Sequence, residues 1–166
     1  MNIIALVDSN FALSNKGRIL ASIPADRKLR FEETRGKVIV YGIGYVQELP
    51  GQQPVADSVN VVFTDGVKAP LKQAKNVILA DTLDEVRKAL KPFKDDDIYI
   101  IDNEKLYKEF LKDVKTCHIT KIDYEYEADA HMDDLDKNPD FEITADSDEL
   151  YCFDIVYNFL KYERKA

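Results

Sequence analysis

The chain has 166 residues, of which 45% are hydrophobic and 33% are charged, so it is long enough to bury a well-packed core. Its formal net charge is −8 and it has no basic stripe, which argues against DNA or RNA as a partner. The apolar run at residues 1–8 is too short for a signal peptide or a membrane span, which favours a cytoplasmic protein with no membrane contact.

The first half of the chain alternates apolar runs with polar segments. Residues 2–7 predict a buried strand, and residues 9–22 predict a loop with a turn at 14–17. A helix is predicted from Pro24 to about Thr34, because proline and an acidic residue such as Asp26 both suit the first turn. Strands are predicted at 37–41 and 59–63, with a short segment at 45–49 and a loop at 52–56 between them.

The second half continues this alternation and then loses its helices. A strand at 76–79 precedes a helix that starts at the capping-box spacing of residues 81–85, and a strand at 97–101 precedes a helix capped by Asn103. Further strands are predicted at 115–127, 141–144 and 150–160, the last two as an antiparallel hairpin. This order favours an α/β fold with a mostly parallel sheet and an antiparallel C-terminal edge.

Residues 125–149 form an acidic segment with eleven Asp or Glu and one Lys, a local charge of −10 that leaves +2 for the remainder. His131 lies in it, but a calcium loop needs a glycine where Asp134 stands, so a solvated acidic loop is favoured over a metal site. The segment could also dock a basic protein partner. Cys117 and Cys152 have no CxxC spacing and predict two free buried thiols in a reducing compartment, and His118 has no ligand partner along its strand.

Asp26 has two interpretations. The ordinary one is a carboxylate at a helix start, near the cations Arg27, Lys28 and Arg30. The other is an acid held near an apolar cleft, where it binds or protonates a substrate.

Six stretches, in order, resemble motifs of the dihydrofolate reductase family. They are Ile23 to Asp26 at the start of the first helix, Lys37 to Gly42, Val59 to Thr64, Ile98 to Leu111, Ile119 to Ile122 followed by Glu127 to Met132, and Tyr151 to Phe153. The resemblance covers essentially the whole chain. It implies one domain, residues 1–166, with that family's α/β fold: a mostly parallel central sheet, an antiparallel C-terminal edge strand and flanking helices.

The family reduces dihydrofolate with NADPH, and the resemblance implies roles for particular residues. Asp26 would be the catalytic acid that binds the amidine-like edge of the pterin, with Thr120 behind it and Tyr107 near the nicotinamide. The implied substrate-binding residues are Ile4, Leu6, Asp26, Arg30, Ile101, Tyr107 and Thr120. The implied cofactor-binding residues are Gly42, Gly44, Thr64, Asp102 and Asn103, and no metal is implied.

The sequence departs from the family pattern where the cofactor phosphates would lie. Asp102 and Asn103 stand at the family's Gly-Gly, and the added carboxylate brings bulk and a like charge against a phosphate. The family's G-R-x-T turn reads Gly42 to Tyr45, which removes the Arg and the Thr. Asp65 follows the strand where a 2′-phosphate would favour a base or a hydroxyl.

The substrate side departs as well. The family's L-P-W reads Ile19 to Ala21, the chain has no Trp, and residues 55–58 lack the Arg that would hold the substrate glutamate. Leu6 replaces a small residue and would crowd a pterin, and Arg30 replaces an aromatic one turn after Asp26.

Two hypotheses follow from these departures. The first is a dihydrofolate reductase-like protein with eroded NADPH and folate sites, weakly active or inactive, which has a binding or protein-interaction role. The alternative is a working but divergent NADPH-dependent reductase of dihydrofolate or another pteridine. A cleft filled by Leu6 and Leu20 would favour the first.

Overall fold

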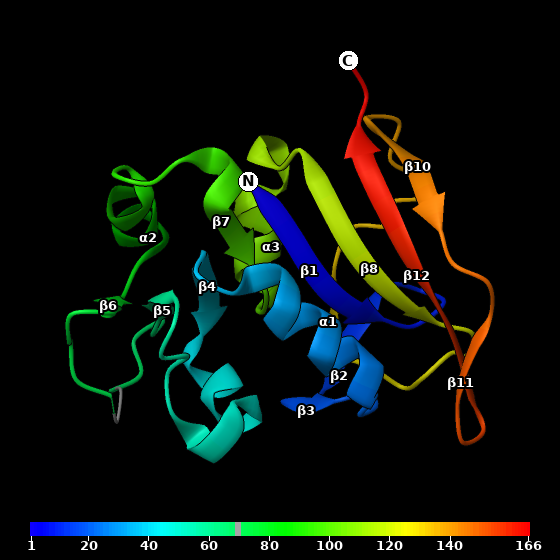
Figure 1. Cartoon of the computed structure of the whole chain (residues 1–166), viewed down its shortest axis with the longest axis horizontal. Helices are drawn as coiled ribbons and strands as arrows, with labels where there is room; N and C mark the ends of the chain where they lie inside the picture. The colour runs from blue at the N-terminus through cyan, green and yellow to red at the C-terminus, as the bar shows by residue number, and fades with distance from the viewer. Residues whose placement is uncertain (69–70) are drawn as a thin grey trace.

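Figure 1 shows the computed structural model of the chain, which describes residues 1–68 and 71–166. Over these residues a nine-stranded sheet has the order β10-β12-β8-β1-β7-β4-β5-β6, with β11 paired to β12. Its strands are β1 Asn2–Val7, β4 Val38–Gly42, β5 Val59–Phe63, β6 Val77–Ala80, β7 Ile98–Ile100, β8 Thr116–Ile122, β10 Phe141–Asp146, β11 Leu150–Cys152 and β12 Ile155–Arg164. The six neighbouring strands β8, β1, β7, β4, β5 and β6 are parallel to one another. β12 is antiparallel to β8, and β10 is antiparallel to β12. The predicted fold class is confirmed.

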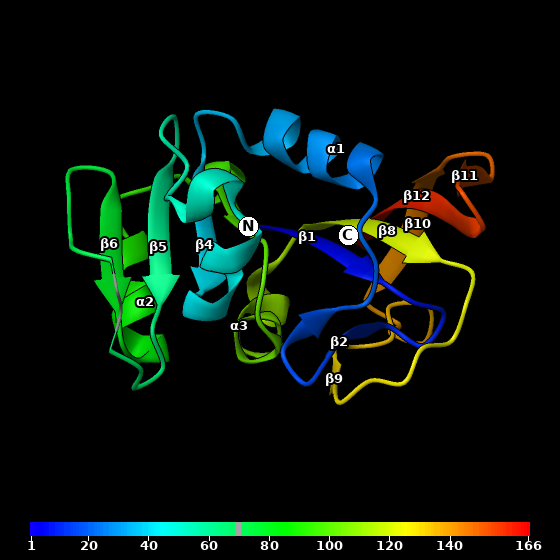
Figure 2. The same ribbon diagram turned by 90° about the horizontal axis from the view of Figure 1, so that it is seen from below.

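Helices cover both faces of this sheet. They are α1 Pro24–Thr34, α2 Leu83–Leu90 and α3 Glu104–Phe110, with short 3-10 helices at Ile43–Glu48, Pro50–Gln52, Asp95–Asp97 and Leu111–Asp113. Figure 2 shows α1 on one side of the sheet and α3 on the other. In β1, Ile3 packs in the cluster that contains α2 and α3 residues, whereas Ile4 packs in the cluster next to α1, so residues 3–7 of the strand are all apolar. In residues 1–68 and 71–166, no helix is long and apolar enough to cross a membrane.

The three predicted helix starts are confirmed, and at two of them a side chain caps the helix. α1 begins at Pro24, in the position where its missing N–H needs no partner. The hydroxyl of Thr82 accepts the backbone N–H of Glu85 at 3.1 Å at the start of α2. The side chain of Asn103 accepts the N–H of Leu106 at 3.2 Å at the start of α3. Local sequence therefore specifies where these helices begin.

A second, three-stranded sheet corrects the prediction that residues 9–22 form a loop. They contain β2 Ala12–Asn15 and β3 Arg18–Ile19, which form a hairpin, and β2 also pairs with β9 Ala130–His131 in the acidic segment. Lys16 and Gly17 take positive φ angles of 50° and 75° at the predicted turn. The strands escaped prediction because β2 gains its partner from a segment more than one hundred residues away.

The C-terminal strands also differ from the prediction. The strand predicted at 115–127 ends at Ile122, because the chain then turns away so that Tyr126 can donate its N–H to the carboxylate of Asp8 at 2.9 Å. The run predicted as one strand at 150–160 is broken by a turn at Phe153, where φ is +54°. The segment predicted at 45–49 lies in the 3-10 helix Ile43–Glu48.

The two thiols differ in burial. Cys117 is buried as predicted, and its burial raises the pKa of the thiol to about 12. Cys152 is partly exposed, which corrects the prediction of two buried thiols. Both are free cysteines in the part of the chain that the structure describes.

Candidate functional site

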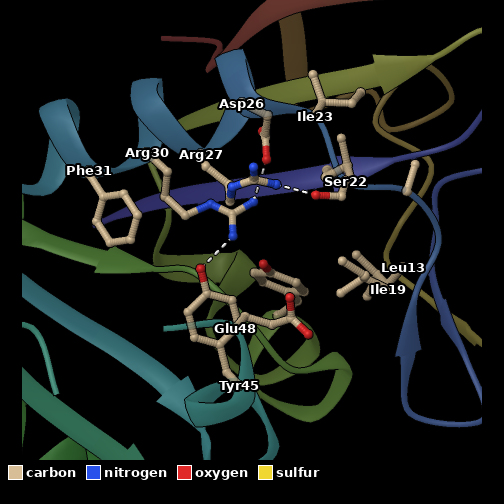
Figure 3. A pocket seen from close by; sticks show the side chains of 13 residues that line it. Leu13, Ile19, Ser22, Ile23, Asp26, Arg27, Arg30, Phe31, Tyr45 and Glu48 are labelled. Atoms are coloured by element: carbon tan, nitrogen blue, oxygen red, sulfur yellow. Dashed lines mark hydrogen bonds and ion pairs between the residues drawn. The ribbon is translucent and has the colours of Figure 1, made fainter. Parts of the chain in front are cut away.

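The carboxylate of Asp26 lies in the first turn of α1 and is only 4% exposed. Its Oδ1 accepts the hydroxyl of Thr120 on β8 at 2.7 Å. Its Oδ2 accepts an N–H of the Arg30 guanidinium at 2.8 Å, one helical turn further along α1. Each oxygen of this acid therefore already has a partner from the chain itself, and Figure 3 shows the one with Arg30.

Arg30 bridges α1 to the 3-10 helix that follows β4. Its second terminal nitrogen donates to the hydroxyl of Tyr45, and its guanidinium carbon lies 5.6 Å from the centroid of that ring. Burial alone would lower the pKa of Arg30, but Tyr45 and Asp26 outweigh burial and raise it above its ordinary value, so the guanidinium stays charged. Its Nε has no hydrogen-bond partner within residues 1–68 and 71–166.

The pocket beside Asp26 has a free volume of only about 70 Å³. Leu6 lines it, whereas Leu20 does not, so Arg30 rather than the expected pair of leucines fills the space. The hydroxyl of Tyr107 donates to the carbonyl of Ile4 at 2.9 Å, and burial raises the pKa of Tyr107 well above its ordinary value. The lining residues are Leu6, Leu13, Ile19, Ala21, Ser22, Ile23, Asp26, Arg27, Arg30, Phe31, Tyr45, Glu48 and Tyr107.

The structure brings most of the predicted substrate-binding residues together. Four of them line the pocket: Leu6, Asp26, Arg30 and Tyr107. Thr120 lies behind the carboxylate, to which it is bonded. Ile4 and Ile101 are 4% and 5% exposed in the core cluster next to α1 and do not line the pocket.

Three of the predicted cofactor residues meet where β4 and β7 end. The backbone N–H groups of Asn103 and Gly42 lie next to the carboxylate of Asp102 and favour its charged form. A Cβ on Gly42 would lie 2.6 Å from the side-chain nitrogen of Asn103, so that side chain closes the gap between the two strand ends. Asn103 has φ of +95°, a conformation that favours glycine, whereas the space beside Gly44 is open.

The charge on Asp102 makes stability depend on pH. Burial, partly offset by Arg30 and the two N–H donors, raises the pKa of Asp102 from 3.8 to about 6. The folded chain therefore holds this proton over a range where the unfolded chain releases it, and stability falls as the pH rises from about 4 to 6. We expect Asp102→Asn to be more stable than wild type by about 1–3 kcal/mol at pH 7 and equal to it near pH 4, measured by urea unfolding. A stability difference that does not change with pH would contradict this.

Thr64 lies apart from these residues, at the end of β5. Its hydroxyl donates to the carboxylate of Asp81 at 2.8 Å, and the N–H of Gly66 donates to the same oxygen at 2.7 Å. These two donors lower the pKa of Asp81. Asp65 pairs with Lys105 at 2.6 Å. The donors that follow β5 are therefore occupied by a carboxylate of the chain.

Sequence reasoning did not select Tyr45 or Asp81 as site residues. The spacing of Asp26 and Arg30 at i and i+4 was a usable signal, because such residues share a helix face. No local signal existed for Tyr45, which reaches Arg30 from a different element. Asp81 was interpreted only as part of a capping box.

A larger groove of about 440 Å³ lies beside the pocket, between α1 and residues 50–57. As predicted, no base comes from residues 55–58. Two cations of α1, Lys28 and Arg35, nevertheless line this groove, with Phe31 and Pro54 among its apolar residues. Glu32 of the same helix and Asp57 also line the groove, so it holds two cations and two carboxylates.

The histidines differ in their surroundings. His118 gains a carboxylate neighbour from α1, with its Nε2 3.7 Å from the Oε1 of Glu33. Burial lowers the pKa of His118. His131 is exposed in β9. In the part of the chain that the structure describes, no three His, Cys, Asp or Glu side chains are grouped as a metal site.

Comparison with known proteins decides the family. The family model described as Dihydrofolate reductase matches residues 1–164. The chain belongs to the dihydrofolate reductase family. Dihydrofolate reductase from Enterococcus faecalis, complexed with NADP(H) and RAB-propyl, has the same fold, with a TM-score of 0.77 over 99% of this chain and 96% of that chain at 18% identity.

A second relative is the bifunctional dihydrofolate reductase-thymidylate synthase of Plasmodium chabaudi. It is 26% identical over 132 residues, which cover 76% of this chain. This chain spans only 22% of the length of that protein. The resemblance inferred from the six motifs is confirmed, and this dihydrofolate reductase family member has Arg30 bonded to the acid of its helix α1.

Proposed function

We propose that this family member has eroded NADPH and folate sites, is weakly active or inactive as a reductase, and has a binding or protein-interaction role. The single observation that supports this most is the pairing of Asp26 with Thr120 and Arg30 in a pocket of about 70 Å³. Ligand pockets usually offer about 300–1,000 Å³. A pterin ring can reach Asp26 only after Arg30 has left. We propose that residues 1–166 form a single domain and that the protein works in a reducing cytoplasm.

The residues that would hold NADPH do not fit its phosphates. The carboxylate of Asp102 lies next to the N–H groups of Gly42 and Asn103, and the donors after β5 already donate to Asp81. A phosphate would have to displace each carboxylate and would be repelled by its charge. These observations support weak or absent NADPH binding.

We expect the purified protein to oxidise NADPH in the presence of dihydrofolate at least about a thousandfold more slowly than an ordinary enzyme, whose kcat is about 10 s⁻¹. The measurement is the loss of NADPH absorbance, with an active dihydrofolate reductase in the same buffer as the control. Turnover at an ordinary rate would reject the proposal.

The alternative is a working, divergent reductase of dihydrofolate or another pteridine. It is favoured by the Asp26–Thr120 bond of 2.7 Å. Lys28 and Arg35 would be the cations that meet an acidic substrate tail in the open groove, where Glu32 and Asp57 offset their charge. Thermal unfolding with millimolar NADPH separates the two hypotheses, because a ligand that binds the folded state raises the Tm. No change in Tm would reject the alternative.

A basic protein partner at residues 125–149 is the form of interaction role that we propose. β10 lies at the end of the strand order and exposes Glu142 and Asp146, whereas Asp136 is already bonded to Lys121 at 2.6 Å. We place the contact at residues 142–149, where Glu142, Asp146, Asp148 and Glu149 are all exposed. A lysine-rich peptide should bind there and weaken as salt rises. Affinity that is unchanged at high salt would contradict an electrostatic contact.

A further inference from the structure

We infer that Arg30 is a built-in occupant of the substrate site: its guanidinium takes the place of a ligand's amidine edge on Asp26 and, through Tyr45, closes the cleft. The inference rests on the proposed function and deepens it. A flat heterocycle with an amidine or guanidine edge would have to displace Arg30 to reach Asp26.

The chemical match between the guanidinium and such a ligand is close. Both present a planar N–C–N group whose N–H bonds point at a carboxylate, which is the geometry of a strong, charge-assisted hydrogen bond. Arg30 makes this bond to Oδ2 of Asp26 at 2.8 Å, while Thr120 holds Oδ1. The acid therefore keeps the orientation that it would need for a ligand, and Arg30 satisfies it.

Through its bond to Tyr45, Arg30 also closes the pocket that its guanidinium occupies. Figure 3 shows the Arg30 guanidinium between Asp26 on α1 and the hydroxyl of Tyr45. The guanidinium thus joins two elements that form opposite walls of the pocket, which leaves only about 70 Å³ between them. A flat ring cannot enter while both bonds are present.

The closure is incompletely satisfied, which leaves it open to displacement. The Nε of Arg30 is buried without a hydrogen-bond partner in the described part of the chain, and a buried donor left unsatisfied is costly. A ligand that gives Asp26 an equivalent N–H edge would release Arg30 toward water. Its apparent affinity would be reduced by the fraction of molecules whose closure is open.

The test is the affinity of the small probe 2,4-diaminopyrimidine for three proteins, measured by calorimetry without any cofactor. Arg30→Leu removes the guanidinium, and we expect it to bind the probe at least about tenfold more tightly than wild type. This factor corresponds to a wild-type protein in which at most about one molecule in ten has Arg30 away from Asp26. Lys28→Leu is the matched control, because Lys28 is a cation of the same helix that lies outside this pocket and pairs with Glu32 instead of Asp26. It should bind the probe as wild type does.

Two further measurements show whether the probe uses Asp26. Adding Asp26→Asn to Arg30→Leu should abolish the gain, and uracil, a neutral ring of similar size, should show no gain. Equal affinity in Arg30→Leu and wild type, or a gain that survives Asp26→Asn, would overturn the inference.

Arg30→Leu leaves a buried carboxylate and could fail to fold, so Tyr45→Phe provides an independent variant. It removes the bond between Arg30 and the hydroxyl of Tyr45 but keeps the ring, whose centroid lies 5.5 Å from the ring centroid of Tyr41. We expect about threefold tighter probe binding, and no gain would overturn the inference even if Arg30→Leu is unfolded. These experiments measure probe binding alone. The probe can therefore show that Arg30 does not block Asp26 while the reductase assay still shows no turnover, and turnover can be observed while Arg30 is still shown to block Asp26.

Discussion

Replacing Asp26 with leucine is expected to lower the free energy of unfolding by about 3–5 kcal/mol, because it leaves the Arg30 guanidinium buried without its carboxylate. The side chains of Asp26 and Arg30 are only 5% and 13% exposed, and a terminal nitrogen of Arg30 lies 2.8 Å from Oδ2 of Asp26. Urea unfolding at neutral pH, followed by circular dichroism, measures the loss.

The chain offers a matched control on the same helix. Lys28 and Glu32 have the same i, i+4 spacing, but they lie 3.9 Å apart and are 77% and 63% exposed, so Lys28→Met should cost less than about 0.5 kcal/mol. The double variant Asp26→Leu/Arg30→Leu should recover most of the loss, since apolar replacement of a whole buried pair is often close to neutral. If Asp26→Leu costs no more than Lys28→Met, the buried pair does not contribute as argued.

Replacing Asn60 with alanine is expected to cost about 3–4 kcal/mol, because one fully buried side chain of β5 holds the loop before it. Its amide nitrogen donates to the carbonyls of Val55, Ser58 and Asn76 at 2.9, 3.0 and 3.3 Å. Its oxygen accepts the hydroxyl of Tyr41 at 2.8 Å and the N–H of Val55 at 3.0 Å. Urea unfolding gives the loss, and hydrogen exchange at Val55 should accelerate.

Tyr41→Phe is the control for Asn60, because it removes one of these hydrogen bonds and leaves the ring in place. It should cost only about 1 kcal/mol and should leave exchange at Val55 slow. Equal losses in the two variants would show that Asn60 does not act as the centre of this network.

The main sheet and its helices could be predicted because their signals are local. Apolar runs mark β1 and β4, and the side chains of Thr82 and Asn103 bond N–H groups three residues away. The small sheet could not be predicted in the same way. β2 and β9 are short and partly polar, and each becomes a strand only when the other is beside it.

Single residues of the candidate site could be predicted from the sequence, but most of the contacts between them could not. The motif resemblance selected Asp26 and Thr120, which the structure joins at 2.7 Å. It also selected Asp102, but not the nearness of its carboxylate to the N–H groups of Gly42 and Asn103, because these come together only where β4 and β7 end side by side.

By itself, the sequence determined the order of the parallel strands and the three helices, the family, and the presence of three cations near Asp26 in α1. The tertiary structure decided which cation pairs with the acid. Arg27 bonds the hydroxyl of Ser22, and Lys28 faces solvent. Arg30 takes the carboxylate because it lies one helical turn from Asp26 on the buried face, where Tyr45 arrives from another element and supplies the second acceptor that its guanidinium needs.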